Sequence, residues 1–410
     1  MRLFILEIKR VLKTPMTIIM LVAALLLSFA LAYIPVTFEY VAKEYDGDRP
    51  VYATGLEAIR LNREKLLEGE ITQDKISHAI STYQQVLKDN HVEETYELPV
   101  KTYNDNFGTI YHLFTPIANA YADKRGEACN IRDIDMAHLG DFYDGADRYF
   151  EAKLRKTEGA YPAALEKARA MRSQVTKPYV FYYGASSNVL DYETVTLLII
   201  LLCCTVAVAP VFSAEYQSGG DSILRCTKYG RTRLALIKIA SALSIAIGSA
   251  ILCLLTWIGG TFAFFGTQGM ETSLQMVLSI ACMLSMNVGQ WIWTHGGLGL
   301  LILTTSLCFT LFVSARSKNN VQAMSISLLA CFAPMIIYWV LPEEMARVVK
   351  CFLPSGGIGL NNSIYFDITG ISFCHIGSLA IWTPYAMIAI SVVELVLFTV
   401  LCIRSYNRHV

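Results

Sequence analysis

Apolar and polar residues follow one another along this chain in long blocks, and six of the apolar blocks are long enough to be membrane spans. A helix needs about 20 mostly apolar residues to cross the hydrocarbon core of a bilayer. The pattern therefore predicts an all-α polytopic membrane protein with six transmembrane helices. The first is expected over 16–35, and the other five lie within 191–410, at 194–212, 239–265, 298–315, 321–341 and 381–403.

The polar block 36–190 separates the first two spans and is long enough to fold as a domain of its own. Apolar residues recur in it at helical spacing, so the domain is predicted to be mainly helical. Two such stripes are Ile76, Ala79, Ile80, Tyr83, Val86 and Leu87, and Leu139, Phe142, Tyr143, Ala146, Tyr149, Phe150 and Leu154. The stretch 92–118 has no clear period, and short strands and an irregular loop both remain open there.

The first fifteen residues, 1–15, are predicted to form an amphipathic helix in the membrane interface. Phe4, Ile8 and Val11 share one face of such a helix, and Arg2 and Lys9 share the other. A signal peptide is the competing interpretation, because a basic start precedes an apolar run. That run lacks a cleavage site with small residues, which favours a retained anchor.

The distribution of charge predicts the sidedness of the spans. With six spans, four segments lie on the side of the N-terminus, and they hold thirteen basic and three acidic residues: 1–13, 214–238, 316–320 and 404–410. The two short loops on the other side hold two basic and four acidic residues. Since basic residues are enriched in cytoplasmic loops, both termini are expected in the cytoplasm and the domain 36–190 outside, in a multi-pass protein of the cell membrane.

Two regions do not fit a simple series of spans. The apolar stretch 274–293 would reverse the sidedness of the later loops if it crossed the membrane, so we expect a re-entrant or interfacial helix that ends near Thr294–Gly297. The loop 342–380 is rich in proline and glycine and is interpreted as a re-entrant hairpin forming an outer gate, with an ordinary ordered loop as the alternative. Cys351 and Cys374 flank part of this loop, and the sequence leaves open whether they form a disulfide.

Between the second and third spans lies a short basic segment, 214–232, which is predicted to be an amphipathic helix against the membrane surface. Gly219 and Gly220 are expected to break the preceding helix. Asp221 then occupies a position suited to an N-cap, and Gly230 one suited to a left-handed C-terminal cap.

Recognisable catalytic and ligand-binding motifs are missing from the sequence. No nucleotide-binding G-x-x-x-x-G-K-[ST] loop, dinucleotide G-x-G-x-x-G turn, H-E-x-x-H or G-x-S-x-G motif is present, and the seven histidines are scattered. The net charge is zero, so no nucleic-acid partner is indicated. We expect no catalytic site, metal or cofactor in this chain, and hence no enzymatic activity of its own.

Glu394 is an acidic residue near the middle of the last predicted span. A carboxylate there costs several kcal/mol unless it is hydrated, protonated or paired. It is a candidate for the lining of a translocation pathway. The alternative is a hydrogen-bonded residue that packs helices together.

The segment after the second span resembles the corresponding segment in permease subunits of ABC-2-type transporters. The matching pattern is Phe212-x-x-Glu215, Gly219, Leu224-Arg225-x-Thr227-x-x-Gly230-Arg231 and then Lys238. The amphipathic N-terminal helix, the six spans and the glycine- and proline-rich loop before the last span also match. The resemblance covers 1–35 and 190–410, whereas the large external insertion occurs only in some branches of that family.

This resemblance implies a bacterial permease subunit that pairs with a second, identical or different, permease in the lipid bilayer and with a cytoplasmic ABC ATPase, which binds the ATP. Its expected role is export of a lantibiotic- or bacteriocin-like peptide, a drug or another amphipathic substrate. The residues implied to contact the ATPase are Glu215, Tyr216, Gly219, Asp221, Leu224, Arg225, Lys228, Gly230 and Arg231. The alternative is a receptor whose outer domain binds a ligand and whose signalling partner is a separate chain.

Overall fold

The computed structural model describes residues 2–47, 49–226 and 230–408, without the side chains of Arg225 and Ile376. It is an all-α polytopic membrane protein: among the described residues, six helical segments are long and apolar enough to cross a bilayer. These segments are α2 (Pro15–Tyr33), α9 (Ser187–Val208) with α10 (Pro210–Ser218), α12 (Thr232–Phe265), α14 (Val288–Arg316), α15 (Asn320–Val340) and α18 (Thr383–Arg408). The six-helix prediction is confirmed.

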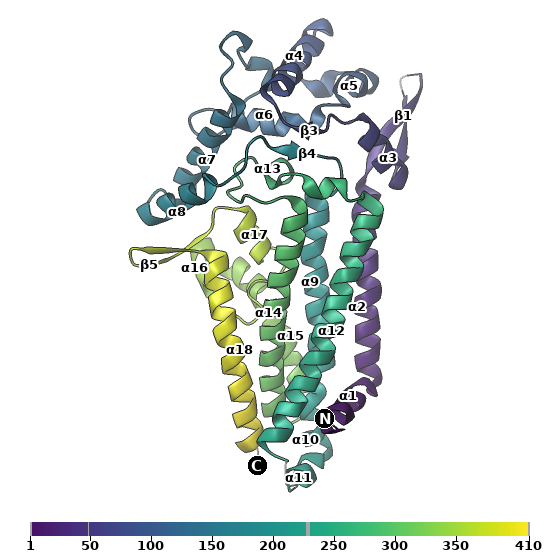
Figure 1. Ribbon diagram of the computed structural model, residues 1–410, viewed down its shortest axis with the longest axis vertical. Helices are drawn as coiled ribbons and strands as arrows, with labels where there is room; N and C mark the ends of the chain where they lie inside the picture. Colours follow the sequence, from purple (N-terminus) through teal and green to yellow (C-terminus); the bar gives the residue numbers. More distant parts are fainter. Residues whose placement is uncertain (1, 48, 227–229, 409–410) are drawn as a thin grey trace.

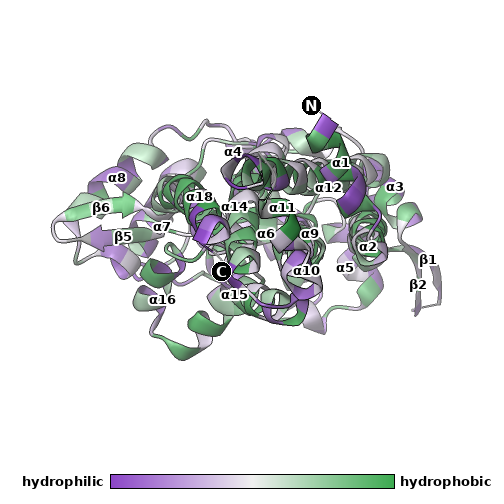
Figure 2. Cartoon of the chain, turned by 90° about the horizontal axis from the view of Figure 1, so that it is seen from below, coloured by the Kyte–Doolittle hydropathy of each residue, from purple (hydrophilic) through white to green (hydrophobic). Residues whose placement is uncertain are grey.

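The helices form an elongated bundle with the polar domain at one end and both chain termini at the other (Figure 1). We call these the domain end and the termini end. Helix α1 (Arg2–Leu12) and helix α11 (Gly220–Arg225) lie at the termini end. Seen from that end, the hairpin β5–β6 (Phe373–Ile376 and Leu379–Trp382) and the hairpin β1–β2 (Tyr40–Asp46 and Arg49–Thr54) project on opposite sides of the bundle (Figure 2).

Helix α9 is the most enclosed of the six segments. It packs against α2, α12, α14 and α15. In the most apolar stretch of α9 and α10, 78% of the residues are buried within the protein, compared with 22% in each of α2, α15 and α18. Helix α9 is therefore the centre of the bundle, and α2, α15 and α18 leave most of their apolar surface for lipid.

The polar domain is built mainly of short helices around its own apolar core. In chain order its helices are α3 (Leu56–Lys65), α4 (Gln73–Asp89), α5 (Val100–Phe107), α6 (Phe114–Ala120), α7 (Phe142–Glu158) and α8 (Pro162–Arg172), with short 3-10 turns at 34–38, 95–97, 111–113, 131–133 and 136–138. All residues of the predicted stripe on α4 are buried. The ambiguous stretch 92–118 holds α5, the start of α6 and two 3-10 turns joined by short irregular segments, and it contains no strand. The hairpin β1–β2 was not predicted.

Short antiparallel strand pairs complete the domain. In β1–β2, Tyr40 pairs with Thr54, and the register shifts by one residue between Ala42 and Glu44. Strands β3 (Gly69–Glu70) and β4 (Val180–Phe181) join the two ends of the domain next to the bundle, with Gly69 opposite Phe181. Because the chain enters and leaves the domain there, these pairs fix its base above the spans.

The segment 274–293 is not one helix, so that prediction is wrong. A 3-10 turn (Gln268–Glu271) and the four-residue helix α13 (Leu274–Val277) precede an irregular stretch, and helix α14 begins at Val288. The irregular stretch is apolar because it is buried beneath the polar domain, where the Arg172 guanidinium donates to the carbonyls of Ile280 at 2.8 Å and Cys282 at 2.9 Å. Burial against protein, rather than against lipid, explains its composition.

The predicted break at Thr294–Gly297 is also wrong, because α14 runs through it without interruption. The glycines in this part of α14 serve packing instead. A Cβ atom added to Gly299 would lie 2.6 Å from Leu197 of α9, and one added to Gly296 would lie 3.5 Å from the Glu193 carboxylate. Small residues at this crossing let two spans approach closely.

The loop before the last span returns into the bundle. After α16 (Glu343–Lys350), residues 354–359 are buried, and α17 (Ile364–Thr369) leads to the β5–β6 hairpin. A Cβ atom added to Gly357 would lie 2.1 Å from Ile302, midway along α14. Irregular backbone at this depth is tolerated where protein covers it, so the interpretation of this loop as re-entrant agrees with its position.

A proline inside α15 explains one contact of the re-entrant loop. Pro334 has no amide hydrogen, so the carbonyl of Ala330, one turn earlier, loses its helical donor. The Ser355 hydroxyl donates to that carbonyl at 2.7 Å, and the Asn362 amide donates to the carbonyl of Pro334 at 3.0 Å. Ser355 therefore satisfies the carbonyl that the proline leaves without a helical donor, and Asn362 adds a second link between the loop and α15.

Candidate functional site

The segment predicted to lie along the membrane surface folds as two short helices that meet at Gly219. Gly219 has a left-handed backbone conformation with φ 69°, and it ends α10 and begins α11. Few residues other than glycine adopt this conformation without strain. The predicted break at Gly219 and Gly220 is present, but the N-cap position falls on Gly219, and Asp221 lies in the first turn of α11. The prediction of Asp221 as the N-cap is wrong because the helix restarts two residues earlier.

A cluster of four charged side chains joins this segment to the rest of the termini end. Lys238, near the start of α12, has no exposed surface. Its ammonium group lies 3.1 Å from Oε1 of Glu7 on α1 and also contacts Oε1 of Glu215 on α10. Three elements that are far apart in sequence thus converge on one buried cation.

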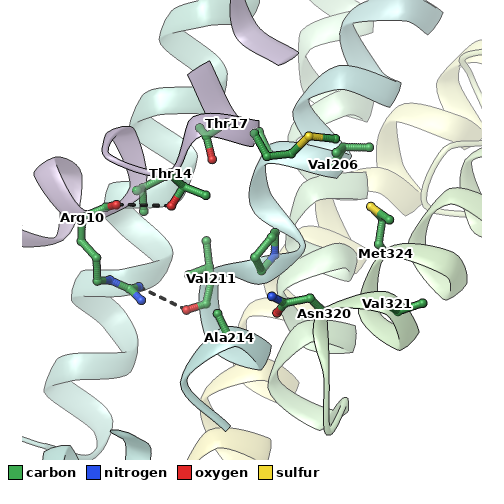
Figure 3. Close-up of a pocket in the computed structure, with 13 residues that line it drawn as sticks. Arg10, Thr14, Thr17, Val206, Val211, Ala214, Asn320, Val321 and Met324 are labelled. Carbon is green, nitrogen blue, oxygen red and sulfur yellow. Dashed lines mark hydrogen bonds between the residues drawn. The ribbon is translucent and has the colours of Figure 1, made fainter. Parts of the chain in front are cut away.

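Arg10 supplies the second cation of this cluster. Its guanidinium lies 2.8 Å from Oε2 of Glu7 and 3.0 Å from Oε1 of Glu215. It also donates to the Val211 carbonyl at 3.1 Å, as Figure 3 shows. Two carboxylates are thereby balanced by two cations, as buried charges require. We call Glu7, Arg10, Glu215 and Lys238 the charge cluster.

The junction between α9 and α10 is held by hydroxyl groups. Pro210 begins α10, and the Ser314 hydroxyl of α14 accepts hydrogen bonds from the amides of Phe212 and Ser213, both at 3.1 Å. The Ser314 hydroxyl also donates to the carbonyl of Ala209 at 2.5 Å. The junction between α9 and α10 is therefore fixed to a neighbouring span.

A cavity of about 310 Å³ opens beside the charge cluster (Figure 3). The turn between α1 and α2, the start of α10 and the start of α15 line it, with Arg10, Thr14, Val211 and Asn320 among its residues. The Asn320 side chain lies 2.8 Å from the Ser213 hydroxyl. The cavity therefore lies between α1 and α15, each of which makes a hydrogen bond to α10 beside it.

The other residues expected at an ATPase contact are distributed over this end of the protein. Tyr216, Asp221 and Leu224 are half-buried, and Arg231 is exposed at the N-cap position of α12. Gly230 is buried, and its carbonyl accepts a hydrogen bond from Tyr406 at 3.3 Å, which ties the end of α18 to this segment. Lys228 and the Arg225 side chain lie outside the described residues, as does the backbone around the expected cap at Gly230.

Glu394 lies in the middle of α18 on the face that carries the buried residues Met387, Ser391 and Cys402. Its Oε2 atom is buried and has no hydrogen-bond partner among the described residues. This placement does not supply the hydrogen bond expected of a helix-packing residue.

Sequence reasoning missed a second buried pair at the domain end of the spans. Glu193 of α9 and His295 of α14 are almost fully buried, with 3.1 Å between Oε2 and Nδ1. The His295 ring stacks on Trp291 at 5.2 Å. Because α9 begins at Ser187 rather than at Thr194, Glu193 belongs to the span. The signal available was that the apolar run 195–212 is shorter than the about 20 residues of a span, so the helix has to extend beyond one of its ends.

Sequence reasoning also missed the roles of Glu7 and Arg10. Glu7 is the one acidic residue in the basic N-terminal segment, and it stands three positions before Arg10. This spacing places both on one side of a helix.

Compared with protein-family models, with curated proteins and with solved structures, the chain matches none of them.

Proposed function

We propose that this chain is the permease subunit of an ABC transporter and that the termini end of the bundle receives the motion of a separate cytoplasmic ATPase. We orient the chain with the termini end in the cytoplasm and the polar domain outside the cell. The enrichment of basic residues in the short segments at the termini end favours this orientation. The proposed activity is ATP-driven export of an amphipathic peptide, drug or similar substrate. The sequence pattern around Glu215 and Gly230, which resembles ABC-2 permeases, supports this proposal.

The observation that carries the proposal is the burial of Lys238 between Glu7 and Glu215. A buried ion pair adds little net stability, because the loss of hydration offsets the attraction. Its established uses lie in fixing one arrangement of elements over others. Here it fixes α1 and α10 to α12, so a force on either short helix is delivered to a span.

The surface of α11 suits a protein partner. Ile223 is 74% exposed although it is a large apolar residue, and Ser222 and Cys226 beside it are also exposed. Helix α10 leads from this surface directly into α9, the central span. A docked ATPase would therefore act at one end of a nearly continuous helical element.

Cys226 offers a direct test, because it is the one cysteine that is exposed among the described residues. The full-length protein is labelled at Cys226 with a photoactivatable maleimide in membranes of its native host, cross-linked and identified by mass spectrometry. We expect a cross-linked ATPase that carries a nucleotide-binding loop. The variant C226S is the matched control and should yield no adduct. Recovery of a sensor kinase, or of lipid adducts alone, would contradict the proposal and favour the receptor or an unpartnered protein.

A further inference from the structure

A cavity lies at the domain end, beside the end of the first span that faces the polar domain. Its volume is about 630 Å³, within the range of small-molecule sites. It lies between the base of the β1–β2 hairpin, α5 and the turn at Tyr111. None of the elements of the charge cluster reaches it.

Tyrosine is the most frequent residue type in the walls of this cavity. Five tyrosines line it: Tyr40, Tyr52, Tyr96, Tyr103 and Tyr111. Tyr96 is 82% exposed, and Tyr40 and Tyr52 are also exposed and pack edge to face at 5.8 Å. Exposed rings that make few contacts within the protein can contact a ligand, and their π-faces attract cations.

Glu39 is the single carboxylate in the lining, and no lysine, arginine or histidine accompanies it there. Its Oε2 atom accepts a hydrogen bond from the Tyr183 hydroxyl at 2.5 Å, and Asn62 donates to Tyr183 at 3.3 Å. Oε1 accepts no hydrogen bond from the described residues, and Glu39 makes no ion pair with any of them. The hydrogen bond from Tyr183 therefore holds the Glu39 carboxylate in place, and no cation among the described residues balances its charge.

Glu39 and Tyr111 also line a second cavity of about 220 Å³, which reaches Gly184 and Ser187 at the start of α9. The carboxylate therefore lies between an aromatic cavity at the edge of the polar domain and the domain end of the central span. At this position the Glu39 carboxylate could bind a molecule before or after that molecule moves along the spans.

We propose that the tyrosine cavity binds a cationic amphiphile: an alkylammonium group held by the Glu39 carboxylate and the tyrosine faces, with an apolar body against the remaining wall. A carboxylate that no protein cation balances attracts a cationic ligand. The tyrosine faces add a cation–π attraction, which also suits bulky and weakly hydrated ammonium groups. An anionic ligand would meet the carboxylate and the electron-rich faces of the rings, so the lining also excludes the opposite charge.

The same chemistry occurs in a soluble amphiphile and in the choline headgroup of a lipid. The inference rests on the proposed function only in taking the soluble amphiphile as the transported molecule. Binding itself needs no ATPase, so it is measured on the purified full-length chain alone. A failure to bind therefore leaves the cross-linking result at Cys226 untouched, and the reverse also holds.

The test is equilibrium dialysis of radiolabelled phenyltrimethylammonium against the full-length protein in nanodiscs, with empty nanodiscs subtracted and benzenesulfonate as the anionic comparison. We expect saturable binding of the cation alone. E39Q keeps an acceptor for Tyr183 but removes the charge, and it should weaken binding roughly tenfold or more, as should Y96L, which removes an exposed ring. Y96F, which keeps the ring, and E57Q, which removes a nearby carboxylate outside the cavity, should bind as the natural chain does.

Equal binding of the cation and benzenesulfonate, or unchanged binding in both E39Q and Y96L, would overturn the proposal. Nanodiscs of phosphatidylcholine and of phosphatidylglycerol distinguish the two sources. Weaker probe binding in phosphatidylcholine assigns the site to the lipid headgroup by competition. Equal affinity in both lipids, with the variant pattern above, assigns it to a soluble cation.

Discussion

The ammonium group of Lys238 lies 3.1 Å from Oε1 of Glu7, although 231 positions separate the two residues in the chain. The contact crosses from the third span to a helix that precedes the first. It makes the N-terminal helix part of the bundle instead of a separate anchor.

Replacing Lys238 by methionine should strongly destabilise the termini end. The change leaves Glu7 and Glu215 buried near one another with one cation fewer, and removing one partner of a buried pair costs about 3–5 kcal/mol. Thermal unfolding of the purified chain in detergent measures the loss. K9M, at an exposed lysine of α1, the helix that carries Glu7, is the matched control. A melting temperature that falls equally in K9M would contradict the role of Lys238.

Ser355 should be needed only because Pro334 interrupts α15. In S355A the carbonyl of Ala330 loses its donor, and an unsatisfied buried carbonyl costs about 1–3 kcal/mol. In the background P334A, an amide at position 334 can bond that carbonyl within the helix, so the same S355A change should cost less. A double-mutant cycle by denaturant unfolding measures the difference. Equal costs in the two backgrounds would refute this explanation.

Cys351 and Cys374, left open by the sequence, should form a disulfide under oxidation. Their sulfur atoms are 3.9 Å apart, and the hydrogen bond from Cys351 lowers the pKa of the Cys374 thiol to about 7. Near neutral pH much of Cys374 is then the reactive thiolate. With a mild copper–phenanthroline oxidant accepting the two electrons, peptide mass analysis should show both thiols lost together as one bridge. C374S should leave Cys351 reduced; an undiminished pair of free thiols in the natural chain would contradict the expectation.

His112 should make the polar domain sensitive to acid. Burial lowers its pKa to about 4 from an ordinary 6.5, and its ring stacks on Phe181 at 4.1 Å. Between these values the unfolded chain binds the extra proton and the folded chain does not, so stability falls as the pH drops from about 7 to 4, by up to roughly 3 kcal/mol.

Hydrogen–deuterium exchange of peptides from the polar domain, in the full-length protein, measures this effect. At each pH the natural chain is compared with H112F, which should lack the acid-dependent increase in exchange. H78F, at an exposed position of α4, is the control and should behave as the natural chain does. An acid response that survives in H112F would assign it to other groups.

The sequence predicts those features that depend on local periodicity or on the length of an apolar block. The six spans, the buried stripe of α4 and the break at Gly219 follow from such rules, and the structure contains them. The polar contacts among elements do not follow, because they depend on which helices meet. Nothing near Lys238 in the sequence indicates that Glu7 is its partner.

The errors have a common physical origin. The composition of the stretch 274–293 and of the glycines near Gly296 predicts lipid or a helix end as their environment. In the structure the first is covered by the polar domain, and the second lets α14 approach α9. A segment rich in apolar residues or glycine is recognised from its sequence as buried, but the sequence does not show whether lipid or protein covers it.

The central position of α9 has a mechanical consequence. Lipid yields to a moving helix, whereas a close-packed protein interior resists compression and passes displacement to its neighbours. Most of α9 is surrounded by protein, and its lower extension α10 is clamped to α14 through Ser314. A displacement of α10 is therefore passed mainly to the other spans, and only a small part of it is absorbed by the bilayer.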